Sequence, residues 1–591
     1  MAHPINTTPQ PLNRLDGAAV SWALNLIDRA SLGDMLDNWR KEDGFDPAKG
    51  GRPAVISDRA LLALFLITAR QGQPLHLTIM LRMLLSQHTT DKALELLELP
   101  SRKRARQLRE SYHTNEMMWY SRLWRSLKRV LSVVDPFEDI PHHRCLERHV
   151  FESIMANRDE EKAEVKWQRA TTFFNALVSS SVEELPAEYR KRWKGDLTVD
   201  GTLIPGVKRG NRRFNAQPTD LMSSEPEAGW YYRDGDNLTH GEVQGKRKAA
   251  KHVWGWEATL VAGVIRDQGT FGQPHLIMGI AFDRPSHNPA LRALEAMRHL
   301  MDNAELPRGT VVGDRAYFGN AKPESFHIPL RKAGYTIVGD YKINQLGRTN
   351  AYESMQLVEG TWYCPAMPQD LVDITTQFRQ GLIDEDTYRD KLEARHRFAM
   401  RRKGADDTGD TQAFMCPGRG KGKTVVCPLV QRKEQDDGRK RGLPTIPAPM
   451  IRPVQKSAVK GKCCTNKASV VIPNDVGVRY RQTGPAYMSK DWQETYGTWR
   501  NVIETRNDYV KNNRGGAAIG DHTRRLVRGF AAAFFFTALG VVAANVALIS
   551  HFLHRVERGI SLVPPPEDPP RSQRRVSDSV YPNAPPEREA S

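Results

Sequence analysis

Three charged side chains recur at helical spacing in the segment 496–511, YGTWRNVIETRNDYVK. Arg500, Glu504 and Lys511 stand at i, i+4 and i+11, and at about 100° per residue they fall within roughly 40° of one another on a helix. Tyr496 lies on nearly the same line, four residues before Arg500. One helix face would thus present a carboxylate between two cations. Such a face suits a site for metal and phosphate, although solvated ion pairs give the same pattern.

Two predicted strands upstream each carry an aspartate. The run DLTVDGTLI (196–204) places Asp200 in mid-strand, and the apolar run GTVVGDRAY (309–317) leads to Asp314. A carboxylate in a buried strand is costly unless a metal, a hydrogen bond or an opposite charge holds it. Two aspartates and a helical glutamate offer the oxygen ligands that hard divalent cations prefer. A pair of such metals is suited to phosphoryl transfer, which is therefore the chemistry that we expect.

The order of these acids and their flanking residues resembles a known family. Asp200 stands in DGT, Asp314 in GDRAY and Glu504 in R-x-x-x-E-x-x-x-x-x-x-K. In this order they resemble the acids of DDE transposases from bacterial insertion sequences, whose third motif is commonly Y-x-x-R-x-x-x-E-x-x-x-x-x-x-K. Tyr496 departs from that pattern, because it stands one residue too far from Arg500.

The resemblance covers roughly residues 195–550 and implies both a fold and an activity. The implied fold is α/β, with an RNase H-like mixed sheet and flanking helices. The implied activity is DNA cleavage and strand transfer, with two Mg²⁺ ions held by the three acids and with Arg500 and Lys511 next to the DNA phosphates. A homodimer that binds element ends and target DNA is also implied. The alternatives are a transposase-derived DNA-binding protein without activity and a structure-specific nuclease.

Length and charge agree with a large DNA-binding protein. The 591 residues are enough for three or four modules. A net charge of +17 and a pI near 9.5 indicate a polyanionic partner, most often nucleic acid. Six cysteines in so long a chain, with no secretory pattern at the start, argue against a disulfide scaffold. We expect a cytoplasmic bacterial protein that associates with the nucleoid when bound to DNA.

Residues 1–160 are predicted to be a helical DNA-binding region. Ser57 or Asp58 can cap the first of two apolar helices, which are separated near Pro74. These two helices are compatible with a helix-turn-helix and equally with an ordinary bundle. A basic cluster follows the second helix and includes Lys103, Arg104 and Arg106. These cations suit DNA phosphates, whereas the nearby Trp119 and Trp124 can stack on bases or form the buried face of their helix.

Residues 195–345 are predicted to form the first part of the RNase H-like catalytic domain. The expected strands are 196–204, 254–265, 275–282, 310–314 and 336–340, with a helix after Asn288 between the third and the fourth. In the RNase H-like order the fourth strand lies beside the first, so Asp200 and Asp314 would meet. Asp340 ends the run IVGD, which resembles the run VVGD that ends at Asp314. Because Asp340 belongs to the fifth strand, it is a weaker candidate for the catalytic aspartate than Asp314.

A β-rich insertion is predicted at 346–485, between the fifth strand and the glutamate helix. It contains Cys364, Cys416, Cys427, Cys463 and Cys464. Five cysteines in a small subdomain suggest a structural Zn²⁺ site, but the absence of a CxxC pair leaves buried thiols as the alternative. The segment GRGKGKT is not a phosphate-binding P-loop. That motif has four residues between its two glycines, whereas three residues separate Gly418 from Gly422.

The predicted region 486–556 holds the glutamate helix and an apolar core helix, and 557–591 is predicted to be a disordered tail. Residues 529–550 contain no charged side chain and are long enough to cross a bilayer of about 30 Å. Thr537, Asn545 and the many alanines favour burial inside a soluble protein instead. We therefore expect no membrane association.

A core helix at this place implies a specific set of interior side chains. Phe534, Phe535, Leu539 and Val542 are predicted to lie in the interior.

Overall fold

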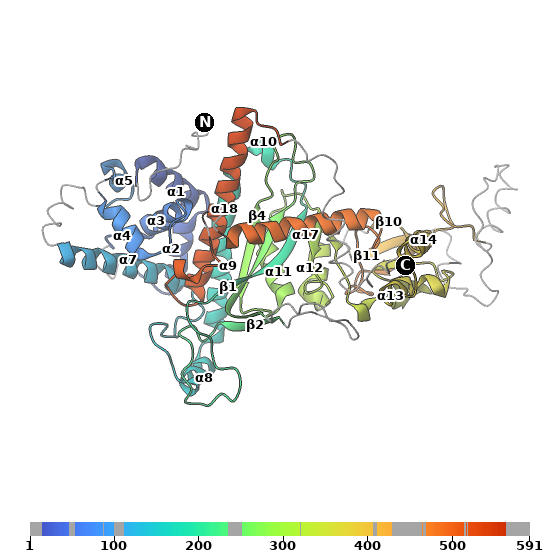
Figure 1. The fold of residues 1–591 in the computed structure, drawn as a ribbon, viewed down its shortest axis with the longest axis horizontal. Helices are drawn as coiled ribbons and strands as arrows, with labels where there is room; N and C mark the ends of the chain where they lie inside the picture. Colours follow the sequence, from blue (N-terminus) through green and yellow to red (C-terminus); the bar gives the residue numbers. More distant parts are fainter. Residues whose placement is uncertain are drawn as a thin grey trace, which may run out of the picture. The chain divides into compact units, whose positions relative to one another are not determined.

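The computed structural model has two compact units in a mixed α/β arrangement (Figure 1). Unit 1 comprises residues 1–194, 199–306 and 502–563, and unit 2 comprises 195–198, 307–501 and 564–591. The residues that the structure describes are 15–46, 54–86, 88–99, 112–233, 251–319, 321–405, 410–427, 464, 469–512, 516 and 518–562. The predicted Lys103, Arg104 and Arg106 lie outside these ranges, as does the tail beyond residue 562.

The N-terminal part of unit 1 is helical, as predicted. Its helices are α1 (Gly17–Arg29), α2 (Leu32–Glu42), α3 (Asp58–Arg70), α4 (Leu77–Leu85), α5 (Asp91–Leu96) and α7 (Tyr112–Val134). Ser57 caps α3, since its side chain accepts a hydrogen bond of 3.1 Å from the Ala60 N–H. Every residue from Ala60 to Ala69 is buried. In a helix-turn-helix the second helix enters the DNA groove, so the burial of α3 agrees equally with that motif and with an ordinary bundle.

The remaining helices of unit 1 include one long apolar helix. They are α8 (Arg148–Asn157), α9 (Glu160–Val182), α10 (Ala187–Arg190), α11 (Pro289–Asp302), the 3-10 turn η7 (His522–Arg524) and α18 (Phe530–Arg558). Helix α18 packs beside α9 and α3 and is visible as the long red helix in Figure 1. The ring centroids of Phe65 and Phe535 are 5.1 Å apart, and those of Phe174 and Phe534 are 4.5 Å apart. The apolar side chains of α18 thus meet protein on several sides.

Helix α18 is long and apolar enough to cross a membrane, but 89% of its most apolar 18-residue window is buried inside the protein. The four side chains predicted to lie in the interior are each at most 1% exposed, namely Phe534, Phe535, Leu539 and Val542. That prediction is confirmed. Burial of this kind is what a core helix of a soluble protein requires.

Unit 1 also holds most of the sheet. Its strands are β1 (Leu197–Pro205), β2 (Gly229–Arg233), β3 (Lys251–Gly263) and β4 (Ile277–Asp283). Only the part of β1 from Val199 onward belongs to unit 1. Strand β3 pairs with β1, and it pairs antiparallel with β2 and with β4 along successive parts of its length. Strand β2 was not predicted. Helix α11 begins after Asn288 as expected, but the Asn288 side chain makes no capping hydrogen bond and its φ is 49°.

Two asparagine side chains form hydrogen bonds with the backbone at the unpaired edge of β4. Asn545 of α18 accepts from the Ile277 N–H (3.0 Å) and donates to the Ile277 carbonyl (2.8 Å). Asn175 of α9 does the same for Ile280, with both distances 2.8 Å. An unpaired strand edge is costly inside a protein, and these amides replace the missing neighbour strand. The polar Asn545 therefore has a structural role in the core.

The sheet of unit 2 is built on the start of β1. Strand β5 (Thr310–Gly313) pairs with β1 and, in parallel, with β6 (Thr336–Val338). The buried Asp196 anchors this pairing, because its Oδ1 accepts a 2.9 Å hydrogen bond from the Thr310 N–H. The helical turns of this part are η3 (Pro323–Ser325), α12 (His327–Lys332) and η4 (Ile343–Gln345).

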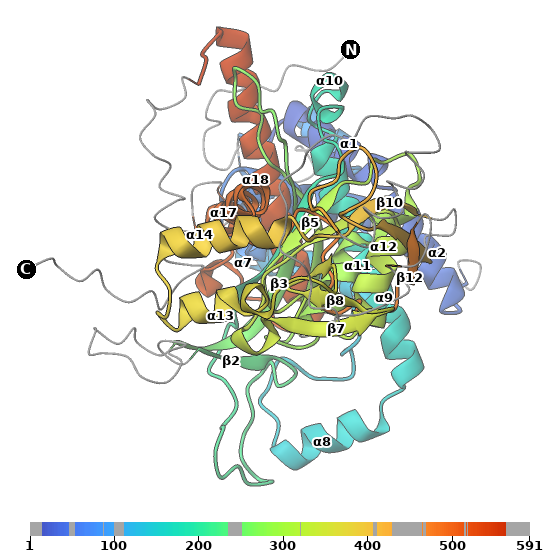
Figure 2. The ribbon, with the colours of Figure 1, turned by 90° about the vertical axis from the view of Figure 1, so that its right-hand side faces the viewer.

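The segment 346–485, also in unit 2, contributes two further antiparallel sheets (Figure 2). One consists of β7 (Arg348–Tyr352), β8 (Met355–Val358) and β9 (Thr361–Tyr363), the other of β10 (Arg401–Ala405), β11 (Thr411–Met415) and β12 (Val470–Pro473). Between them in the chain lie η5 (Gln369–Leu371), α13 (Ile374–Arg379) and α14 (Glu385–His396). Arg395 and Glu359 form a fully buried ion pair of 2.6 Å.

Candidate active site

The glutamate motif forms a helix, as its spacing predicts. Helix α17 runs from Lys490 to Lys511. Its residues up to 501 belong to unit 2, and its residues from 502 onward belong to unit 1. In unit 1 this helix meets the strand that carries Asp200. The Asn507 Nδ2 donates a 3.1 Å hydrogen bond to the Asp200 Oδ2. Asp200 is half-buried at this contact.

Asn507 is a site residue that the sequence analysis missed. Its side chain is only 5% exposed, and its Oδ1 has no hydrogen-bond partner among the described residues. Glu504, one turn earlier, shares its helix face and is exposed. The Asp200 carboxylate, the Asn507 Oδ1 and the exposed Glu504 all offer hard oxygen donors, which are the atoms that a divalent cation prefers.

Gly201 of the DGT motif makes room for another carboxylate. A Cβ placed on Gly201 would lie 2.2 Å from the Oε1 of Glu257, which projects from the neighbouring strand β3. The other oxygen of Glu257 accepts a 2.8 Å hydrogen bond from the Ser286 N–H. The glycine is therefore explained by packing within the sheet.

The second aspartate, Asp314, lies in unit 2 directly after β5. Its Oδ1 accepts a 2.7 Å hydrogen bond from the Ala316 N–H, which closes a tight turn, and the residue is half-buried. Tyr496, in the unit 2 part of α17, lies near this turn. Burial and the charges of Asp340 and Asp314 raise the pKa of the Tyr496 hydroxyl. The charge of Arg500 lowers it. The charges of Arg500 and Asp314 thus both act on this hydroxyl.

Tyr496 is held by packing. Its ring stacks on Trp492 with centroids 4.6 Å apart and planes 10° from parallel, and the residue is 8% exposed. The one-residue departure from the family's tyrosine spacing therefore places this ring in the interior of unit 2, within reach of the charges around Asp314.

Asp340, the alternative to Asp314, is fully engaged in structural contacts. Its Oδ2 pairs with the Arg315 Nε at 2.6 Å. Its Oδ1 accepts hydrogen bonds from the Tyr487 hydroxyl (2.7 Å) and from the Tyr341 N–H (2.8 Å). Because both oxygens are used inside unit 2, Asp340 is a poorer metal ligand than Asp314, whose second oxygen is not used by its turn.

The predicted acids thus belong to both units: Asp200 and Glu504 to unit 1, and Asp314 to unit 2. Within the described ranges, no three side chains of the His, Cys, Asp and Glu types stand in a metal-binding group. The meeting of the three acids at one metal site stays a prediction. Lys511 is half-buried at the end of α17, where its carbonyl accepts from the Gly520 N–H at 3.2 Å.

Comparison of the chain with protein-family models, with curated proteins and with solved structures found no match.

Proposed function

We propose that this protein is a DNA transposase that cuts the ends of an insertion sequence and joins them to target DNA by in-line phosphoryl transfer. The proposal combines the motif order of Asp200, Asp314 and Glu504 with the contacts that their elements make. It assigns the catalytic chemistry to these three acids and the positioning of DNA to basic residues around them.

The contact between Asn507 and Asp200 carries the proposal. The two residues are 307 positions apart in the chain, yet the hydrogen bond between them is 3.1 Å long. The sequence motifs require the DGT strand and the R-x-x-x-E helix to meet, because one metal must reach both. The contact between Asn507 and Asp200 meets this requirement for the two elements that carry Asp200 and Glu504.

The strand pairings support an RNase H-like core for the catalytic domain. The successive pairs β4 with β3, β3 with β1, β1 with β5 and β5 with β6 give the order that the transposase resemblance implies. The antiparallel β3–β4 pair and the parallel β5–β6 pair also have the expected directions.

Each residue of the site has a proposed role. Asp200, Asp314 and Glu504 would hold two Mg²⁺ ions, which when bound activate the attacking water or 3′ hydroxyl and stabilise the leaving 3′ oxygen. Asn507 positions the Asp200 carboxylate through its N–H donor. Arg500 and Lys511 bind phosphates beside the cut through charge-assisted hydrogen bonds.

Other parts of the chain would bind DNA away from the reaction. Lys103, Arg104 and Arg106 would contact the phosphate backbone, in keeping with the net charge of +17. The active complex would be a homodimer, because two element ends have to be joined. The burial of α18 favours a soluble protein, which we place in the cytoplasm and, when bound to DNA, at the nucleoid.

The test uses DNA from the regions that flank the coding region, incubated with the full-length protein and Mg²⁺. Asp200→Asn, Asp314→Asn and Glu504→Gln should each abolish strand cleavage and leave DNA binding intact. Glu494→Gln is the matched control, because Glu494 is exposed on the same helix and should retain activity. An active Asp314→Asn variant beside an inactive but folded Asp340→Asn variant would refute the assignment.

The products separate the proposal from its alternatives. Transposition requires that the cut 3′ ends become joined to a second DNA molecule. Cleavage without joining would indicate a structure-specific nuclease, and binding without cleavage would indicate a DNA-binding protein that has lost its activity.

A further inference from the structure

Four cysteines that are far apart in the sequence come together in unit 2. They follow one another along the chain as Cys364, Cys416, Cys427 and Cys464. Three of them precede a proline, in the phrases CPAM, CPGRG and CPLV. The backbone pairings and side-chain contacts around them locate all four at one end of the β10–β11–β12 sheet.

Strand pairing brings the first two cysteines together. The Cys364 N–H donates a 3.0 Å hydrogen bond to the Phe398 carbonyl. Cys416 directly follows Met415, which is paired with Arg401 at the start of β10. The short segment from Phe398 to Arg401 therefore has Cys364 on one side and Cys416 on the other.

The other two cysteines are held against the loop that begins at Cys416. A Cβ placed on Gly418 would lie 3.1 Å from the Cβ of Cys427. The Arg419 guanidinium donates a 3.4 Å hydrogen bond to the Cys464 carbonyl. Both Gly418 and Arg419 belong to the turn that Cys416 starts, in which the Arg419 N–H donates to the Cys416 carbonyl at 3.1 Å.

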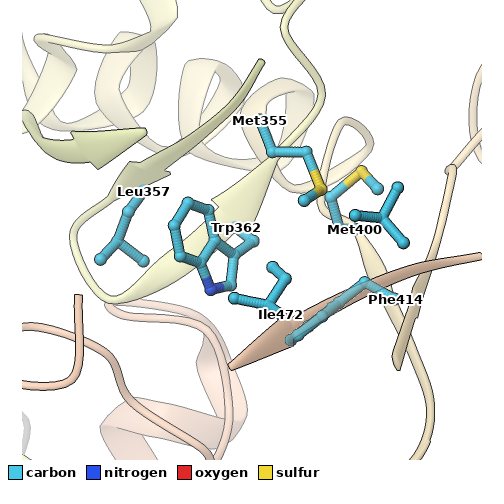
Figure 3. Close-up of a cluster of buried hydrophobic side chains, with 7 residues drawn as sticks. Met355, Leu357, Trp362, Met400, Phe414 and Ile472 are labelled. Carbon is cyan, nitrogen blue, oxygen red and sulfur yellow. The ribbon is translucent and has the colours of Figure 1, made fainter. Parts of the chain in front are cut away.

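Cys464 also contacts the hydrophobic cluster of this subdomain. Figure 3 shows the cluster, in which Trp362, Phe414 and Ile472 come from three different strands. Cys464 packs against the cluster from outside. Because Phe414 lies two residues before Cys416, this packing holds Cys464 on the same side of the sheet.

The thiols are near enough to affect one another's charge. Burial, with smaller contributions from the other three thiols, raises the pKa of Cys364 to about 12. Burial also raises the pKa of Cys416, with added contributions from Cys427 and Cys464. The four thiols therefore lie near one another in unit 2.

We propose that Cys364, Cys416, Cys427 and Cys464 bind one structural Zn²⁺ ion. Four cysteine ligands and no water are the common composition of a closed structural zinc site, with tetrahedral geometry and Zn–S distances of about 2.3 Å. Binding converts the four thiols to thiolates and releases their protons. The site is independent of the proposed transposase activity, because it requires none of the acids of the candidate active site.

The surroundings favour thiolates once a metal is present. The backbone N–H of Ala366 lowers the pKa of the Cys364 thiol, and that of Gly418 lowers the pKa of the Cys416 thiol. In both cases the donor is two residues after the cysteine, so each C-P-x turn directs an N–H at its own sulfur. Such second-shell donors orient the ligands of a metal and stabilise their charge.

Nearby cations offset the charge of the site. Four thiolates and one Zn²⁺ carry a net charge of −2. Arg401 donates to the Cys416 carbonyl at 3.4 Å, and the charge of Arg419 lowers the pKa of the Cys416 thiol. In the described residues no three candidate ligands already stand in metal-binding geometry, so binding must turn the thiols toward a common point.

The test measures zinc in the full-length protein purified without added metal. Elemental analysis should find about one zinc per chain. Cys364→Ser, Cys416→Ser, Cys427→Ser and Cys464→Ser should each remove most of this zinc. Cys145→Ser is the matched control, because Cys145 is exposed in unit 1 and should keep the full amount. Cys463→Ser should also keep it, and loss of zinc in that variant in place of Cys464→Ser would overturn the ligand set.

A second measurement covers variants that fail to fold. Cobalt replaces zinc in the unmodified protein, and tetrahedral thiolate coordination gives a strong sulfur-to-cobalt charge-transfer band in the near ultraviolet together with visible d–d bands. The bands should appear with about one equivalent of cobalt and disappear when zinc is added. Absence of zinc from the purified protein together with absence of these bands would show that the four cysteines are buried thiols only.

Discussion

The Asn507 amide donates a hydrogen bond of 3.1 Å to the Asp200 carboxylate and so joins the glutamate helix to the first strand of the sheet. The Oδ1 of the same amide is buried and has no hydrogen-bond partner within the described part of the chain. An amide that binds a carboxylate with one atom and keeps the other available suits a place beside a metal. Asn507 thus links the packing of α17 to the chemistry proposed for Asp200.

The first prediction follows from this contact. Asn507→Ala should lower the rate of DNA cleavage about 10- to 100-fold and raise the Mg²⁺ concentration needed for half-maximal activity, because the Asp200 carboxylate loses its positioning donor. DNA binding should not change. Asn512→Ala, at the exposed end of the same helix, is the control. Equal activity of the two variants at every Mg²⁺ concentration would show that Asn507 has no role at the metal site.

The second prediction concerns DNA affinity. Changing Lys103, Arg104 and Arg106 together to alanine should weaken binding to all DNA sequences and make the slope of log K against log salt shallower by about 2 to 3. The reason is that each phosphate contact releases a counterion without reading a base. Lys191→Ala with Lys194→Ala, two exposed cations of unit 1, serves as the control. A slope equal to that of the unmodified protein would identify the cluster as a solvated surface.

The third prediction tests the core role of α18. Asn545→Leu leaves the N–H and carbonyl of Ile277 without their partners and should lower the free energy of unfolding by about 2–5 kcal/mol. Thr537→Val is the control, because Thr537 bonds only to the Ala533 carbonyl of its own helix and should cost much less. If α18 lay in lipid, Asn545→Leu would not destabilise the protein. The protein would then also remain in the membrane fraction after a carbonate wash.

The fourth prediction concerns acid sensitivity in unit 2. Burial, together with the neighbouring charges of Arg331 and Arg479, lowers the pKa of His327 to about 3. A histidine with a lowered folded-state pKa contributes stability above its ordinary pKa of 6.5, and this contribution is lost as the pH falls from there toward 3.

His327→Phe removes this titration, and the new ring would lie beside Phe318 and Phe326. Between pH 7 and pH 4 the unmodified protein should lose on the order of 3 kcal/mol more of its unfolding free energy than the variant. Urea unfolding at both pH values measures the difference. His551→Phe, at an exposed position, should behave like the unmodified protein, and the same pH dependence in His327→Phe would contradict the prediction.

The sequence predicted the elements that have a strong periodic signal. Five of the strands and the helix after Asn288 were located within a few residues, because alternating or continuous apolar runs report burial directly. Strand β2 was missed. Its residues GWYYR form a short aromatic run without flanking alternation, and they pair with the start of β3, which was expected to begin only at residue 254.

The side chains that connect elements were harder to predict than the elements. Asn507 has no motif of its own, and the only signal in the sequence was its place one turn after Glu504 on the same helix face. The sequence analysis used Asn545 as an argument for burial of its helix, but it did not predict the partner of this side chain, which is the edge of β4. Partners of this kind depend on tertiary contacts, which no local pattern encodes.

The central claim is that Asp200, Asp314 and Glu504 share one metal site, and metal-directed cleavage of the protein itself tests it most directly. Iron(II) bound in place of Mg²⁺, with ascorbate and peroxide, generates radicals that cut the backbone next to its ligands. We predict cuts in three separate segments, around residues 200, 314 and 504. Excess Mg²⁺ should suppress them, and Asp200→Asn should abolish all three together. Cuts that omit the segment around 314, or that persist unchanged in Asp200→Asn, would contradict a shared site.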